Sequence, residues 1–180
     1  MSKAKKLILA GLLLAILIIF DRFISIKTQY LQISFSFLPI ALAAIVLGPK
    51  YSCSIATLGD LIGSLLWPFG EYFIGFTLVD TAIGLIFGLC LYNKNEGEFF
   101  EGKKLLIRLC IACVLTLWIV ELPIMSLMLS LLYGNAFIVV LTGRLATKLV
   151  MFPIEIAIIY FLSKYIKTLS KKYLYTDLEA

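Results

Sequence analysis

Apolar residues follow one another along this chain in long runs that short polar connections separate. A helix of about 20 predominantly apolar residues crosses the hydrocarbon core of a bilayer. The runs predict helices over residues 6–23, 35–47, 105–132 and 137–165, and a hairpin of two further helices around residues 59–88. We therefore predict an all-α membrane protein, a bundle of six transmembrane helices that forms one integral-membrane domain across residues 1–180.

The composition is far from that of a soluble domain, because 62% of the 180 residues are hydrophobic and only 15% are charged. The first apolar run lacks an Ala-x-Ala cleavage site and further runs follow it, so we expect a retained helix and not a signal peptide. Gly48-Pro49 predicts a tight turn, and Pro123 predicts a kink in the fifth helix. The alternation of apolar and polar residues over 25–35 indicates an extended or re-entrant loop.

Lysine and arginine residues predict the orientation of the bundle, because cytoplasmic loops carry an excess of both. With the N-terminus inside, twelve of the 16 cations fall at the inner ends of the helices, and the outer loops hold Lys27 alone. The twelve are Lys3, Lys5, Lys6, Lys50, Lys94, Lys103, Lys104, Arg108, Lys164, Lys167, Lys171 and Lys172. Both termini are thus expected to be cytoplasmic. The net charge of +5 follows from this topology, so we expect contact with membrane lipid and no nucleic-acid partner.

The hairpin carries a stripe of small and polar residues on each of its helices. The stripes consist of Ala56, Asp60, Gly63 and Trp67 on the first helix, and of Thr77, Asp80 or Thr81, Gly84 and Gly88 on the second. Small residues let helices approach closely in lipid, and a carboxylate that faces lipid costs at least ~2.5 kcal/mol. We therefore expect the stripes to face inward as the wall of a polar site, capped by the aromatic residues of the connecting loop.

Three cations belong to neither membrane surface. Arg22 lies near the outer end of the first helix, whereas Arg144 and Lys148 share one face of the sixth helix with Met151 and Glu155. Intramembrane ionisable groups are costly and commonly mark a ligand or ion path, so a binding site is the favoured explanation of the cluster. The alternative is a set of buried ion pairs with the membrane carboxylates, which are Asp60, Asp80, Glu121 and Glu155.

Two motifs that would indicate a nucleotide or metal site fail on their chemistry. The segment Gly97–Lys104 has the spacing of a phosphate-binding loop, but Lys104 stands where Ser or Thr should hold Mg²⁺. Cys110 and Cys113 have the spacing of a metal or redox pair, yet no second pair accompanies them and the chain contains no histidine. We therefore expect no ATPase site, no metal, no cofactor and no disulfide in this chain.

Two other function classes compete with a binding protein. Asp60 and Asp80 on neighbouring helices are the arrangement of an intramembrane aspartyl protease, in which two carboxylates activate water. The Gly-x-Gly-Asp signature of that family requires glycine where this chain has Thr57, and no Tyr-Asp pair lies on an earlier helix. A secondary transporter is the second alternative, although no internal repeat accompanies it here.

A further group of motifs runs from the first helix to the sixth. The group consists of Arg22–Ile26, Phe35–Pro39, Gly48–Pro49, Asp60–Gly63, Pro68–Gly70, Tyr72–Phe73, Gly75–Leu78, and Tyr133–Gly134 with Arg144. The Gly-Phe-Thr-Leu hairpin motif at Gly75–Leu78 is the most specific of them. Together, over about residues 10–160, they resemble the substrate-binding S component of an energy-coupling-factor (ECF) vitamin transporter, most closely the folate-specific type.

The resemblance implies a six-helix protein of the bacterial cell membrane that captures folate from outside and is not itself an enzyme. It also implies delivery to a module of two cytoplasmic ATPases and one transmembrane coupling protein. Cations and acids would meet the two ends of folate, and aromatic residues would stack on it. The candidate substrate-binding residues are Arg22, Asp60, Trp67, Phe69, Tyr72, Phe73, Glu121, Arg144 and Lys148. Met125-Ser126 stands where the folate type tends to carry Asn-Thr, which leaves another vitamin, such as pantothenate, as an alternative.

Gly11 and Ala15 lie one turn apart on the first helix, where small residues allow a second helix to approach closely. S components use an Ala-x-x-x-Ala motif in this helix against the coupling protein, although Gly11 replaces the first alanine here. The resemblance therefore implies that Gly11 and Ala15 contact the partner. Packing inside the bundle is the alternative.

Overall fold

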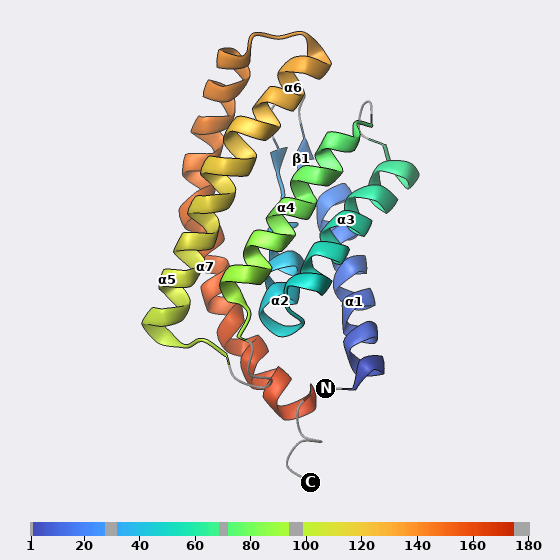
Figure 1. Cartoon of the computed structure of the whole chain (residues 1–180), viewed down its shortest axis with the longest axis vertical. Coiled ribbons are helices and arrows are strands. Elements are labelled where there is room, and N and C mark those ends of the chain that lie inside the picture. The colour runs from blue at the N-terminus through green and yellow to red at the C-terminus, as the bar shows by residue number, and fades with distance from the viewer. Residues whose placement is uncertain (1, 28–31, 69–71, 94–98, 175–180) are drawn as a thin grey trace.

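The computed structural model of the chain describes residues 2–27, 32–68, 72–93 and 99–174. In these segments six helices pack into an elongated bundle (Figure 1). They are α1 (Lys3–Arg22), α2 (Phe37–Val46), α3 (Pro49–Leu66), α4 (Ile74–Leu91), one continuous helix made of α5 (Gly102–Leu115), η1 (Thr116–Ile124) and α6 (Met125–Tyr133), and α7 (Phe137–Leu174). The prediction of a bundle of six helices is confirmed.

Among the described helices, three are long and apolar enough to cross a membrane, namely Ile74–Leu91, Gly102–Tyr133 and Phe137–Ile166. By contrast, α2 has only ten residues and extends over about 15 Å, half the thickness of the hydrocarbon core. All of its residues except Leu42 are buried, and it packs against α1, α3, α4 and α7. This short apolar helix therefore forms the centre of the bundle.

One face of α1 packs against α3 and α2. Leu13 and Leu17 on this face are buried, and Leu17 lies so close to Gly59 of α3 that a Cβ atom at Gly59 would collide with it. The opposite face is exposed, with Leu7 and Ile8 both at least 70% accessible. α1 is therefore a peripheral helix with one packed side and one open side.

The predicted hairpin is formed by α3 and α4. Its small residues face inward as predicted: Ala56 is 1% exposed, and a Cβ atom at Gly84 would lie only 2.7 Å from the Ser52 carbonyl oxygen. The hydroxyl oxygens of Thr57 and Thr81 lie 2.7 Å apart in a hydrogen bond between the two helices. At the end of the stripe, in contrast, Trp67 is 45% exposed.

The connection after α1 contains two short antiparallel strands, β1 (Ile26–Lys27) and β2 (Gln32–Ile33). Ile26 pairs with Ile33. The prediction of an extended connection is confirmed for these residues, whereas 28–31 lie outside the described part of the chain. From β2 the chain leads through Ser34 and Ser36 into α2.

The fifth helix runs without a break from Gly102 to Tyr133, three residues longer than predicted at its start. Where a kink is predicted at Pro123, the structure has η1, a nine-residue π-helix. The helix ends at Gly134, whose φ of +68° is a left-handed conformation that glycine adopts without steric cost. The last helix, α7, then continues past its predicted end at Tyr165.

The start of α1 and the end of α7 lie at one end of the bundle, and the turn at Gly134 lies at the other (Figure 1). Which end is cytoplasmic stays a prediction from the Lys and Arg distribution. In a cysteine-free background, Asn135→Cys is expected to react with a membrane-impermeant reagent added to whole cells, and Lys103→Cys is expected to stay unlabelled. The reverse labelling pattern would show that the bundle has the opposite orientation in the membrane.

Candidate functional site

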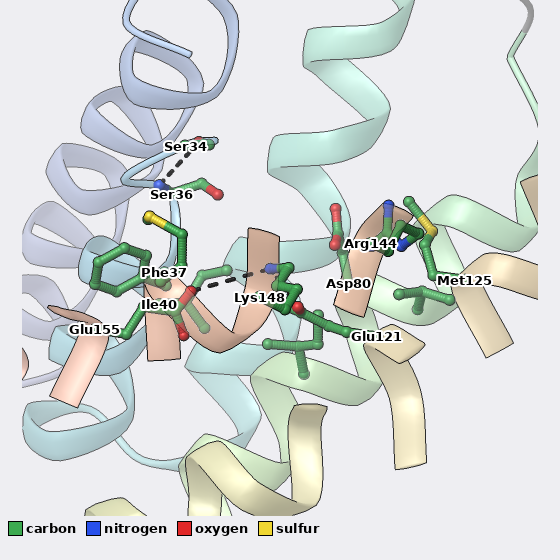
Figure 2. Close-up of a pocket in the computed structure, with 13 residues that line it drawn as sticks. Ser34, Ser36, Phe37, Ile40, Asp80, Glu121, Met125, Arg144, Lys148 and Glu155 are labelled. Atoms are coloured by element: carbon green, nitrogen blue, oxygen red, sulfur yellow. Dashed lines mark hydrogen bonds and ion pairs between the residues drawn. The ribbon is translucent and has the colours of Figure 1, made fainter. Parts of the chain in front are cut away.

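A pocket lies between the start of α2, α4, the fifth helix and α7, and its empty volume including the open mouth is about 660 Å³. The polar lining consists of Ser34, Ser36, Asp80, Glu121, Arg144, Lys148 and Glu155, and the apolar lining of Phe37, Ile40, Val79, Ile83, Met125 and Met151 (Figure 2). Three carboxylates and two cations thus meet in one pocket.

Helix α7 supplies the largest share of this lining. Arg144, Lys148, Met151 and Glu155 recur at steps of four, three and four residues, which keeps them on one helical face. All four line the pocket, so the face predicted from their spacing is the one that the structure turns inward. The opposite face carries exposed apolar residues such as Val139 and Val150.

Lys148 is the centre of an ion cluster in the pocket. Its Nζ forms an ion pair with the Glu121 carboxylate of η1 and lies 4.0 Å from Oε1 of Glu155 (Figure 2). The three side chains are only 15–19% exposed. Two acids therefore share one lysine, and the acids outnumber the cation at this end of the pocket.

Arg144 and Asp80 line the pocket from α7 and α4 respectively (Figure 2). Arg144 is only 6% exposed, although a guanidinium is almost always charged. A buried cation of this kind requires anionic or hydrogen-bonding partners. Such a group is suited to hold a ligand carboxylate with two parallel hydrogen bonds.

A second polar cluster joins α1, α3 and α4. Nη2 of Arg22 lies 3.2 Å from Oδ1 of Asp60, and its Nη1 donates to the Trp67 carbonyl at 3.5 Å. The Thr77 hydroxyl donates to Oδ2 of Asp60 at 2.6 Å and lies 2.9 Å from the Tyr72 hydroxyl. Asp60 is thus bound from both sides, by an arginine and by a threonine.

The Arg22 side chain packs closely against Gly63 of α3. A Cβ atom at position 63 would lie 2.5 Å from Nε of Arg22 and 3.2 Å from its Cζ, so any larger residue here would require the Arg22 side chain to shift. By contrast, a Cβ atom at Gly143 in α7 would have no neighbour within 4 Å.

Gly63→Ala is expected to lower the thermal stability of the protein, because it displaces Arg22 from Asp60. Gly143→Ala is the matched control, and it is expected to be neutral or stabilising because alanine favours a helix over glycine by up to about 1 kcal/mol. Thermal unfolding of the two purified variants measures the difference. Equal melting temperatures would show that the close contact between Gly63 and Arg22 contributes nothing to the stability of the protein.

The sequence matches a known family over most of its length. A model of the ECF transporter substrate-specific component matches residues 5–163. This chain belongs to that family. The match confirms the resemblance seen in the motifs and identifies the chain as an S component, a multi-pass protein of the bacterial membrane that acts in transport and not as an enzyme.

Two relatives of this chain are folate transporters named FolT. The protein from Clostridium novyi (strain NT) is 32% identical over 160 residues, which cover 89% of this chain and 88% of the relative. The protein from Leuconostoc mesenteroides subsp. mesenteroides is 30% identical over 163 residues, which cover 88% and 84% of the two chains.

Two solved structures are similar to this S component. A crystal structure of FolT bound with folic acid matches with a TM-score of 0.80 at 31% identity and covers 89% of this chain and 93% of the other. A structure of the S component of a bacterial ECF transporter matches with a TM-score of 0.50 at 22% identity, over 99% and 100% of the two chains. The second likeness shows the fold alone.

The candidate ligand residues of this S component divide between the two clusters. Glu121, Arg144 and Lys148 line the pocket, whereas Arg22 and Asp60 bind each other outside its lining. Asp60 is bound by Arg22 and Thr77, whereas Asp80 lines the pocket, so the two carboxylates have different surroundings.

Two of the aromatic candidates, Trp67 and Tyr72, contact the Arg22 cluster. The Trp67 ring packs edge to face on Phe23, with ring centroids 5.4 Å apart, and Phe73 packs likewise on Phe76 at 5.8 Å. Tyr72 reaches the cluster through its hydroxyl group. Phe69 lies outside the described residues.

Four polar pocket residues are absent from the candidate set, namely Ser34, Ser36, Asp80 and Glu155. Glu155 shares the predicted face of α7, and Asp80 belongs to the predicted stripe of α4, so both carry a periodic signal. Ser34 and Ser36 belong to the connection before α2, where no helical period marks the residues that face the pocket. Ser34 reaches its position through hydrogen bonds to the Ser36 N–H, at 3.1 Å, and the Phe20 carbonyl, at 3.4 Å.

Gly11 and Ala15 lie on the open face of α1, beside the exposed Leu12. A Cβ atom at Gly11 would have no neighbour within 4 Å. Within the described residues, neither small side chain is therefore used for packing inside the bundle.

Proposed function

We propose that this S component binds folate from outside the cell and delivers it to an ATP-driven energy-coupling module. The observation that carries the proposal is the likeness to FolT bound with folic acid, at a TM-score of 0.80 and 31% identity over 89% of this chain. The two sequence relatives at 32% and 30% identity are folate transporters as well.

The charges of the pocket suit both ends of folate, which carries two carboxylates on its glutamate tail and amino and ring N–H donors on its pteridine. Arg144 and Lys148 supply positive charge for the carboxylates. Asp80, Glu121 and Glu155 supply acceptors for the pteridine donors. A pocket with cations alone would fit the tail and leave these donors unsatisfied, which is costly when they are buried.

The order of charges along α7 favours one orientation of the ligand. With a rise of 1.5 Å per residue, Arg144 lies about 10 Å and Glu155 about 27 Å from the start of α7 at Phe137. At the deeper end, Glu121 and Glu155 outnumber Lys148. We therefore place the pteridine at this deeper end and the glutamate tail toward Arg144.

The open face of α1 at Gly11 and Ala15 is the proposed contact with the transmembrane coupling protein. Two features support it: small residues allow close helix approach in lipid, and neither residue has a packing role within the described bundle. Neither residue lines the pocket, so docking and ligand binding use separate surfaces. Two cytoplasmic ATPases of the same module would hydrolyse ATP, since the Gly97–Lys104 segment lacks the chemistry of a nucleotide site.

Uptake by reconstituted vesicles tests the proposal. Vesicles that contain only this chain are expected to bind folate at their surface and to accumulate none, with or without a proton or sodium gradient. Addition of the coupling module and internal ATP is expected to start accumulation. Gradient-driven uptake by the chain alone would contradict the proposal and would favour a secondary transporter.

A further inference from the structure

The exposure pattern of the fifth helix changes its period at η1. Exposed residues recur every three or four positions along Ile107, Ile111, Val114 and Trp118, and they do so again along Ile124, Leu127 and Leu131. Between them, the exposed pair Trp118 and Ile119 is followed five residues later by the exposed pair Pro123 and Ile124. One turn of this helix is therefore a residue wider than its neighbours.

The wide turn determines whether the Glu121 side chain faces lipid or the pocket. In an uninterrupted α-helix, the next lipid-facing position after Trp118 comes 3.6 residues later, between Glu121 and Leu122. In η1, however, Val120 and Leu122 are only 2% and 3% exposed, and Glu121 between them reaches Lys148 in the pocket. The additional residue thus turns the carboxylate from lipid into the pocket.

Pro123 supplies the physical cause of the wide turn. It has no N–H for the Ile119 carbonyl, and its ring would collide with that carbonyl in an α-helix. The Met125 N–H is shared between the carbonyls of Leu122 and Val120, and the bond to Val120, five residues back, is the π-helical pattern. Pro153 in α7 offers a contrast, because it lies inside a helix whose α-helical pattern continues past it.

From this geometry we infer that Pro123 is a positioning residue of the ligand pocket. It maintains the wide turn that directs Glu121 to Lys148, although Pro123 itself does not line the pocket. The inference deepens the proposed function, on which it rests only for the identity of the ligand.

The first arm of the test measures the direction of residue 121 without any ligand. Glu121→Cys is introduced into a chain whose four native cysteines are replaced, with and without Pro123→Ala, and a hydrophilic thiol reagent is applied. Labelling is expected to be about tenfold slower with Pro123→Ala, because a thiol that faces lipid meets little water. Pro153→Ala, the matched proline control, is expected to leave the rate unchanged. Equal rates with and without Pro123→Ala would overturn the inference.

The second arm measures folate affinity in a double-mutant cycle. Pro123→Ala is expected to weaken binding severalfold when Glu121 is present and to have no effect in the Glu121→Gln background. A merely structural proline would cause the same loss in both backgrounds, and that result would overturn the inference. If the labelling rates differ while the native chain fails to bind folate, the positioning role stands and the proposed function falls.

Discussion

Arg144→Met is expected to weaken folate binding by about 2–5 kcal/mol, or roughly 30- to 5,000-fold, the usual cost of truncating one partner of a buried charge pair. Arg144 is 6% exposed and lines the pocket, where the glutamate tail of folate is proposed to lie. Methionine has a similar length and tolerates a buried, irregular environment, so the variant keeps the packing and loses the charge. Calorimetric titration of the purified variant measures the change in affinity.

Arg108→Met is the matched control for this experiment. Arg108 is exposed, donates to the Cys90 carbonyl at 3.1 Å and stacks on Phe100, outside the pocket. Its replacement is expected to leave folate affinity unchanged. If Arg144→Met binds folate as tightly as Arg108→Met does, Arg144 is a structural cation and the proposed placement of the glutamate tail is wrong.

The double variant Gly11→Trp with Ala15→Trp is expected to abolish folate uptake by the complete transporter and to leave folate binding by the isolated chain intact. Two indole rings on the open face of α1 would prevent a second helix from approaching closely. They would not disturb the bundle, since a Cβ atom at Gly11 has no neighbour within 4 Å. Uptake by vesicles with the full module and titration of the isolated chain give the two readouts.

Ala157→Trp serves as the control for bulk on a lipid-facing helix, because Ala157 is likewise exposed on the outer face of α7. It is expected to leave both readouts unchanged. Normal uptake by the Gly11 and Ala15 double variant would contradict the proposal that these residues contact the coupling protein. Loss of binding together with loss of uptake would instead assign these residues to internal packing.

The helices and one wall of the pocket are predictable from the sequence. Long apolar runs specify helices because backbone groups in lipid must be satisfied within the segment. The four-, three- and four-residue steps from Arg144 to Glu155 specify one helical face, and the structure turns this face into the pocket. Both features are local, so a single segment contains all the information that they require.

The division of the charged residues into two clusters is not predictable in this way. Arg22 pairs with Asp60 because α1 lies against α3 and because Gly63 leaves room for the guanidinium. Which helices become neighbours depends on packing across the whole bundle, and spacing within one helix does not record it. The same reason separates Asp60 from Asp80, although they lie on adjacent helices of one hairpin.

The π-helix at η1 shows a second limit of local patterns. Pro123 predicts a disturbance of the fifth helix, but a proline can produce a kink, a break or a wide turn. The structure has the wide turn, which brings Glu121 to Lys148 and away from lipid. Spacing around Pro123 does not record which of these forms results, and the partner that Glu121 reaches lies in α7, 27 residues further along the chain.

The central claim, that this S component binds folate, is tested most directly by calorimetric titration of the purified full chain without ATP or partner subunits. Calorimetry is preferable to tryptophan fluorescence, because Trp67 and Trp118 are 45% and 60% exposed and neither lines the pocket. Folic acid is expected to bind with one site per chain, and pantothenate at the same concentration is expected to give no binding heat. Absence of folic acid binding, or tighter binding of pantothenate, would contradict the account.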